Sequence, residues 1–330
     1  MASAISEIPQ IPNVEQRYIE GKGRCLFATQ PFKKGETIFV EDPIIACQFA
    51  WNKSYDYSAC DHCMKQIHYP PESMNIMLLA KLVATIHLAE NREAMYNQFM
   101  QFCHISCDDK GASTSTLLGE KFQCDIDNMW HLFSSALHER CSNGQDDPVI
   151  KTVELIFLML LTREGFIKML SLVARNGQGI GTSILAQWAN KVLSMNVCAD
   201  DQTDYDSLIE NIYQEIENHV GIFINNEGSG LYSMQSCINH SCAPNAKIAF
   251  PFNCSRLALV AKKDILPGEE IFITYLDKCS RKRSCHSRRK ILQNHYLFEC
   301  MCSKCLLDST NEPDVTSDDD DDDDDMDEDM

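Results

Sequence analysis

Three cysteines near the end of the chain constrain its fold more than any other feature of the sequence. Cys300, Cys302 and Cys305 follow the spacing Cys-x-Cys-x2-Cys. Cysteines this close together cannot form disulfides with one another without severe strain. The spacing suits a tetrahedral zinc site that is completed by one distant thiolate. Cys242 is the candidate for that fourth ligand, and unpaired buried thiols are the alternative interpretation.

Cys242 belongs to a second unusual stretch, SCINHSCAPN, which runs from Ser236 to Asn245. Asparagine and proline favour turns, so the backbone must leave regular structure here. Asn239 and His240 place hydrogen-bond donors and acceptors side by side, which a fold rarely does unless a ligand or a backbone is held there. The stretch therefore predicts a loop with a binding role.

The cysteine content indicates the compartment. The chain has 17 cysteines in 330 residues, and its first twelve residues lack the apolar region of a secretory signal. Many cysteines without a secretory signal favour reduced thiols and bound metal over a disulfide framework. We expect a cytoplasmic or nuclear protein, and no membrane association, since the apolar runs are too short to span a bilayer.

The net charge of −19 is concentrated at one end. From Glu312 to Asp329 the chain carries 13 acidic and no basic residues, so the remaining body carries −6. A tail of this composition cannot bury enough apolar surface to fold, and we expect it to be disordered. The body has no basic stripe, so direct nucleic-acid binding is not expected.

Glycine-rich stretches mark two turns and one ambiguous motif. Gly21-Lys22-Gly23 predicts a tight turn between two short strands, and its cations could face an anionic group, although a plain hairpin is the simpler interpretation. A second turn is expected at Lys34-Gly35-Glu36. The run from Asn176 to Ser183 superficially resembles a dinucleotide-binding loop, but a helical pattern precedes it and no β-α-β unit frames it. We reject that interpretation.

The remaining periodicity predicts helices in the first half of the chain and strands near the end. Ile271–Tyr275 is the strongest strand signal, because it is β-branched and aromatic. The basic run from Arg281 to Lys290 reads as a solvated helix face. Apolar spacing further predicts helices at Asn75–Met100, Met129–Arg140, Val149–Val173 and Asp204–Glu217, and strands at Ala246–Phe250 and Leu257–Ala261.

Cys60-Asp61-His62-Cys63 is half of a zinc-binding knuckle. A structural zinc needs a second pair of ligands, usually some 10–20 residues further on. The next cysteines, Cys103 and Cys107, lie beyond a predicted helix, and His68 is single. The sequence favours loss of a complete finger over an unusual one.

The chain contains five distinctive segments in a fixed order: GKGRCLFAT from Gly21, EGSGLY from Glu227, NHSCAPN from Asn239, GEEIFITYLD from Gly268, and the FxCxCxxC end from Phe298 to Cys305. Together they resemble a SET-domain protein-lysine methyltransferase of the SET and MYND family, in the branch that lacks a long helical C-terminal domain. The chain departs from the family in its incomplete MYND finger and in Cys25, which stands where a glycine is usual.

The resemblance implies an α+β fold. Its core would be a mainly β SET domain of small sheets, with the segment ending at Tyr275 threaded under the Asn239 loop as a pseudoknot, an exception to the usual rule against threading. The implied parts are an N-terminal SET portion (1–58), a MYND remnant (59–66), a helical insertion (67–175), the C-terminal SET core (176–298), a cysteine-rich post-SET segment (299–306) and the acidic tail (307–330).

The resemblance also implies an enzyme that transfers methyl groups from S-adenosylmethionine to lysine. This in-line displacement needs an aligned, neutral amine, so positioning and desolvation supply most of the rate. Tyr275 would orient the amine and Tyr296 would line its channel. The implied cofactor-binding residues are Lys22, Gly23, Arg24, Asn176, Asn239, His240 and Phe298, and the implied ligands of one structural zinc are Cys242, Cys300, Cys302 and Cys305.

Two classes of function remain open from the sequence. The first is an active, monomeric methyltransferase acting on basic proteins, such as histone tails or ribosomal proteins, which suit an acidic partner. The second is a catalytically silent adaptor that binds partners through its helical insertion and acidic tail. Retention of Tyr275, Asn239 and His240 favours the enzyme, since a scaffold does not need them.

Overall fold

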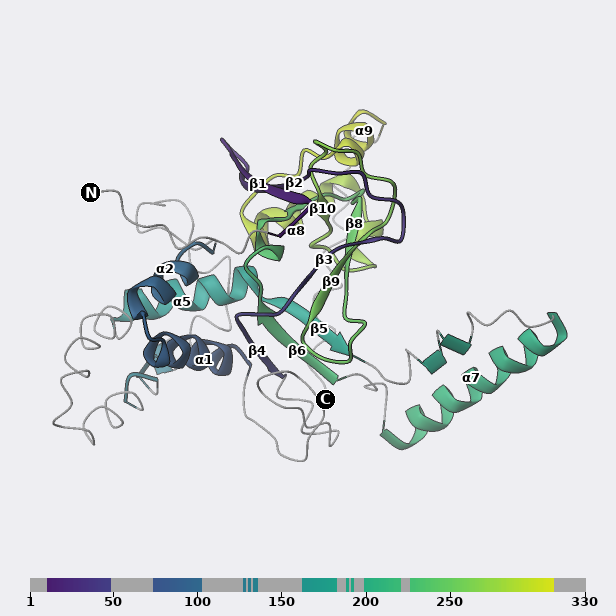
Figure 1. The fold of residues 1–330 in the computed structure, drawn as a ribbon, viewed down its shortest axis with the longest axis horizontal. Helices are drawn as coiled ribbons and strands as arrows, with labels where there is room; N and C mark the ends of the chain where they lie inside the picture. Colours follow the sequence, from purple (N-terminus) through teal and green to yellow (C-terminus); the bar gives the residue numbers. More distant parts are fainter. Residues whose placement is uncertain are drawn as a thin grey trace.

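Figure 1 shows the fold as a computed structural model. The MYND remnant lies outside the residues that it describes, and the acidic tail (307–330) and the predicted helix at Met129–Arg140 lie only partly within them. The described residues are 11–48, 74–102, 127–128, 130–131, 133–135, 162–182, 188–189, 191–192, 199–220 and 226–311.

The N-terminal hairpin predicted around Gly21 is confirmed. Strands β1 (Val14–Ile19) and β2 (Gly23–Ala28) pair antiparallel. Gly21 and Gly23 both have a positive φ, near +77° and +76°. Residues with a side chain adopt this conformation only at a cost, so these two glycines set the tight turn that carries Lys22.

One three-stranded sheet joins a strand from the N-terminal part of the chain to two strands that lie more than 200 residues further on. Its order is β3 (Thr37–Glu41), β9 (Leu257–Ala261) and β8 (Ala246–Ala249), with antiparallel pairing throughout. The strands predicted at Ala246–Phe250 and Leu257–Ala261 are confirmed. This sheet supports the Asn239 loop, which lies just before β8.

A second antiparallel sheet has the order β4 (Ile45–Gln48), β6 (Asn226–Leu231) and β5 (Gln178–Thr182). The glycine-rich run near residue 180 forms β5, an edge strand that pairs with β6. An edge strand of an antiparallel sheet has no phosphate-binding turn, so the rejection of the dinucleotide interpretation is confirmed.

The Asn239 loop pairs with the segment that ends at Tyr275. Strands β7 (Asn239–His240) and β10 (Phe272–Ile273) lie parallel. This is the contact that the expected pseudoknot requires. β10 is shorter than the predicted strand, because side chains rather than backbone oxygens accept hydrogen bonds from this segment. Asn245 Oδ1 accepts from the Phe272 N–H at 2.7 Å, and His240 Nδ1 accepts from the Tyr275 N–H at 2.9 Å.

Helices cover the second sheet on one side (Figure 1). Helix α1 (Met74–Leu88) packs on β4 and on α5 (Arg163–Asn176). The predicted single helix at Asn75–Met100 is divided, because the Asn91 side chain accepts a hydrogen bond from Ala94 N and so begins α2 (Arg92–Phe99). The buried core of this region includes Leu78, Leu82, Phe99, Phe166 and Leu170.

Helix α7 (Ala199–Val220) extends away from the sheets in Figure 1 and contains the predicted acidic helix.

The strands enclose a separate apolar core, whose members include Leu26, Phe39, Ile180, Tyr232 and Leu257. The α+β class with small sheets is thus confirmed. No helix in the described part of the chain is both long enough and apolar enough to cross a bilayer.

The C-terminal segment forms a third, smaller core. A short 3-10 turn, η4 (Ser280–Lys282), is followed by α8 (Cys285–Tyr296) and α9 (Ser303–Asn311). Ser284 begins α8 by accepting a hydrogen bond from Ser287 N. The prediction that Arg281–Lys290 is a solvated face is wrong for Arg288, which is only 1% exposed because it packs against α9 and the neighbouring cysteines.

Candidate active site and thiolate cluster

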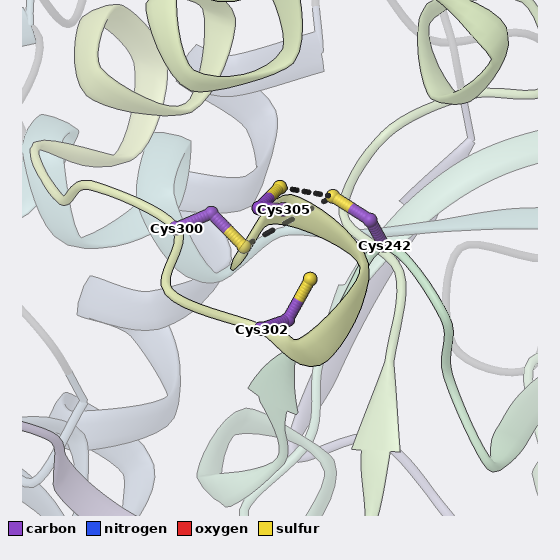
Figure 2. Close-up of side chains that lie close together, drawn as sticks. All are labelled: Cys242, Cys300, Cys302 and Cys305. Carbon is purple, nitrogen blue, oxygen red and sulfur yellow. Dashed lines mark hydrogen bonds between the residues drawn. The ribbon is translucent and has the colours of Figure 1, made fainter. Parts of the chain in front are cut away.

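The four predicted zinc ligands converge in the structure (Figure 2). The sulfur of Cys242, from the loop after β7, lies 4.0 Å from that of Cys300 and 3.5 Å from that of Cys305. All four sulfurs, including that of Cys302, lie within 4.8 Å of one another. A tetrahedron with zinc–sulfur bonds of about 2.3 Å has sulfurs about 3.8 Å apart. The cluster therefore fits zinc in its residue types and in its spacing.

The electrostatics of the cluster also call for a cation. All four cysteines are free thiols rather than disulfides. A hydrogen bond from Cys300 lowers the pKa of Cys242 to about 3, and the same contact raises the pKa of Cys300. Burial raises the pKa of Cys305 to about 12. Burial acts to raise the pKa of Cys302, but backbone hydrogen bonds outweigh it and lower that pKa. The thiolate form is thus favoured at Cys242 and Cys302 and opposed at Cys300 and Cys305, and a bound divalent cation would favour it at all four.

Aromatic side chains gather beside this cluster. The ring of Tyr275 lies 4.8 Å from that of Tyr296, and at 6.3 Å edge-on to that of Phe298. His240 lies 5.3 Å from Tyr275 and 6.0 Å from Phe298. Burial raises the pKa of Tyr296, so its hydroxyl stays protonated. The structure therefore brings four of the predicted site residues into one aromatic group.

Hydrogen bonds fix Tyr275 and His240 within this group. The Tyr275 hydroxyl donates to the carbonyl of Ile238 at 2.8 Å. Because His240 Nδ1 accepts from Tyr275 N, the neutral ring carries its proton on Nε2, which lies 3.4 Å from the Cys242 sulfur. His240 consequently links the aromatic group to the thiolate cluster.

A polar network joins the predicted cofactor residues of the hairpin and the loop. The Asn239 amide lies within hydrogen-bond distance of Arg24 O, Cys25 Sγ and a carboxylate oxygen of Glu270, the last at 3.0 Å. The other oxygen of Glu270 accepts from Lys22 Nζ at 2.8 Å. Glu270 was not among the predicted site residues, and its only sequence signal is its place in the Gly-Glu-Glu motif.

Asn176 lies at the end of α5, and its amide donates to Leu172 O in the preceding turn. A role of Asn176 toward a cofactor stays a prediction. Its neighbour Arg175, which the sequence did not single out, donates to the backbone oxygen of Tyr296 at 3.1 Å. This bond ties the end of α5 to the end of α8, where the aromatic group begins.

Glu41 is a further residue that the sequence did not reveal. Its carboxylate accepts hydrogen bonds from the backbone N–H groups of Met234 and Gln235, at 2.8 and 3.0 Å. These groups start the 3-10 turn η3 (Gln235–Cys237) that leads into the Asn239 loop. Burial raises the pKa of Glu41 to about 6. No motif marks this position, the last residue of β3, where an acidic residue is ordinary.

Comparisons with known proteins agree with this geometry. The sequence pattern of the SET domain matches residues 23–276. The human protein-lysine N-trimethyltransferase SMYD5 is 36% identical over 93% of this chain and 89% of its own length, and its Danio rerio counterpart is 35% identical over 93% and 90%. Human histone-lysine N-methyltransferase SMYD3 is 41% identical over 28% of this chain and 20% of its own.

Proposed function

Because this chain belongs to the SET-domain family, we infer that it is an S-adenosylmethionine-dependent protein-lysine N-methyltransferase. The observation that carries this function is the aromatic group around Tyr275. It lies beside the Asn239 loop, in a chain that matches protein-lysine methyltransferases over nearly all of its length. A silent adaptor does not need a tyrosine hydroxyl held at a fixed point among aromatic rings.

The chain's residues suit the steps of this reaction. Aromatic walls from Tyr275 and Tyr296 would desolvate the substrate lysine and favour its neutral amine. The anchored hydroxyl of Tyr275 would orient that amine, since alignment supplies most of the rate in a displacement of this kind. The bound sulfonium compound would supply an activated methyl group.

The hairpin and loop residues fit the polar parts of such a cofactor. Lys22 and Arg24 offer cations to a carboxylate, and the Asn239 amide contacts both the Arg24 backbone oxygen and Glu270, the partner of Lys22. Phe298 offers a ring face for stacking. The side-chain oxygen of Gln235 is buried and accepts no hydrogen bond from the described residues. This unused acceptor is further evidence that a polar ligand binds beside the loop.

We extend the proposal to the substrate and its location. A body charge of −6 favours a basic protein partner, such as a histone tail or a ribosomal protein. The relatives' names include a trimethyltransferase and a histone methyltransferase, which supports lysine in a protein as the acceptor. Cysteine usage supports a location in the cytoplasm or the nucleus, and we propose that the protein works as a monomer.

A transfer assay tests this function. The full chain is incubated with labelled S-adenosylmethionine and core histones or ribosomal proteins. We expect label on a basic protein, and a loss of roughly 100-fold in rate for Tyr275→Phe, because the hydroxyl no longer positions the amine. Tyr18→Phe is the matched control, since Tyr18 is 79% exposed on β1 and should leave the rate unchanged.

Two outcomes would contradict the proposal. If no basic protein accepts label from the folded wild-type chain, the adaptor function is favoured. If Tyr275→Phe transfers methyl groups as fast as Tyr18→Phe, the aromatic group is not the site of the reaction.

A further inference from the structure

Arg288 is the most deeply buried charged residue among those that the structure describes. It lies in the first turn of α8 and is 1% exposed. A buried guanidinium is costly unless negative charge compensates it, so its neighbours show what holds it there. Basic residues around it in the sequence, such as Lys282 and Lys290, remain at the surface.

The guanidinium faces three acceptors. Its Nη1 donates to Arg283 O at 2.6 Å, and its Nη2 donates to an Asp308 carboxylate oxygen at 2.7 Å. The same Nη2 lies 3.5 Å from the sulfur of Cys305. Asp308 is shared, because it also accepts from Lys304 one turn earlier in α9. Arg288 is therefore not neutralised by Asp308 alone, and part of its charge is directed at the thiolate cluster.

The cluster needs such a charge when it holds zinc. Four thiolates and one divalent cation carry a net charge of −2, and three of the four cysteines are fully buried. Asp308 adds a negative charge nearby and Lys304 offsets it. Arg288 supplies such a charge 3.5 Å from the Cys305 sulfur, while His240 Nε2 lies 3.4 Å from the Cys242 sulfur.

We propose that Arg288 is the counter-charge of the four-cysteine zinc site. Its guanidinium neutralises part of the negative charge of the bound thiolates, and its hydrogen bond to the Arg283 backbone oxygen keeps it in place. The competing explanation is mechanical, with Arg288 serving only to tie α8 to α9 through Asp308. The two explanations predict opposite effects of removing Asp308, and neither depends on the methyl-transfer function.

The zinc affinity of variants at Arg288 and Asp308 distinguishes the counter-charge role from the mechanical role. The zinc-loaded full chain is titrated with a chromophoric chelator, and folding is checked by circular dichroism. Arg288→Gln should bind zinc about 10- to 100-fold more weakly, the usual effect of losing a residue that supports metal ligands. Arg288→Lys should fall between this variant and the wild type, since it keeps the charge but loses the second donor.

Asp308→Asn is the decisive variant, because it removes a negative charge and leaves Arg288 in contact with Cys305. A counter-charge role predicts zinc binding at least as tight as in the wild type. The mechanical role predicts weakening similar to that of Arg288→Gln. This comparison remains informative even if Arg288→Gln does not fold, since Arg288→Lys then takes its place.

Arg289→Gln is the matched control. Arg289 follows Arg288 in α8, but it contacts Glu299, Met301 and the backbone oxygen of Cys300 rather than a sulfur of the cluster. Its zinc affinity should stay within about threefold of the wild type. The proposal is overturned if Arg288→Gln also stays within that range, or if Asp308→Asn weakens zinc binding as much as the arginine variants do.

Discussion

Glu41 shows how a single side chain organises the loop that carries the site. Its two oxygens hold the N–H groups of Met234 and Gln235, at the start of the turn before Asn239. Burial raises its pKa to about 6, from an ordinary 4.5. The folded protein therefore binds this proton more tightly than the unfolded chain does.

This difference predicts a pH dependence of stability. A carboxyl with a raised pKa stabilises the fold fully below about pH 4.5, and that contribution is lost as the pH rises through about 6. A shift of 1.5 units amounts to about 2 kcal/mol. In Glu41→Gln this fall should disappear. Urea unfolding measures the free energy of unfolding of the wild type and of Glu41→Gln between pH 4.5 and 7. If this free energy falls equally with pH in both proteins, the assignment to Glu41 is contradicted.

Some functional residues were predictable from the sequence and others were not, for a physical reason. The four cysteines were predictable because thiolate spacing is a local pattern that few other structures use. Tyr275 was predictable because of the motif around it. Glu41 and Arg288 were not predictable, because the identity of one charged residue does not show that segments distant in the sequence will bury its side chain.

Among the elements, the junction of α5 and β5 depends on close contact between backbones. A Cβ on Gly177 would lie 2.9 Å from Ser229 Oγ, on β6, and 2.9 Å from Val173 O. Real Cβ atoms essentially never approach so closely. The glycine therefore allows α5 to end directly against the sheet, beside Arg175 and its bond to the Tyr296 backbone.

Gly177→Ala should destabilise the protein by about 1–3 kcal/mol, the usual cost of adding volume where none is free. Gly179→Ala is the control in the same run, because nothing lies within 4 Å of its Cβ position, and it should change stability by less than about 0.5 kcal/mol. The measurement is the urea midpoint of each variant. Equal midpoints for the two would show that the junction has room to adjust.

Element boundaries were the weaker part of the sequence prediction. β8 and β9 were found nearly to the residue, because short apolar segments bounded by turn-forming residues leave a clear pattern. The helix at Asn75–Met100 was divided by a cap at Asn91, and the strand at Ile271–Tyr275 was shortened by side-chain acceptors from the Asn239 loop. Both differences arise from polar side chains that compete for backbone groups, which hydrophobic periodicity does not register.

At the scale of the whole molecule, two apolar clusters meet at the site. Tyr275 packs against both the strand core and the C-terminal core, which holds the cysteines. The zinc site therefore belongs to a small unit that closes the active site rather than to the main fold. Its loss should affect function more than overall folding.

Cys302→Ser should lose the zinc of this cluster and reduce methyl transfer by roughly 100-fold or more, because the C-terminal segment no longer places Tyr296 and Phe298. Cys279→Ser is the control, since Cys279 is exposed and lies outside the cluster. Elemental analysis and the transfer assay measure both effects. Full activity and cofactor affinity in a zinc-free variant would contradict this role.

The pairing of Lys22 with Glu270 has a consequence for biosynthesis. The two residues are 248 positions apart, and Asn239 meets Arg24 across 215. A ribosome adding about 5–20 residues per second needs roughly 10–50 s to cover that distance. During this interval the N-terminal hairpin must wait, with its apolar face uncovered, for strands that do not yet exist. The last thiolate, Cys305, emerges later still, so an interrupted chain is left both inactive and prone to aggregate.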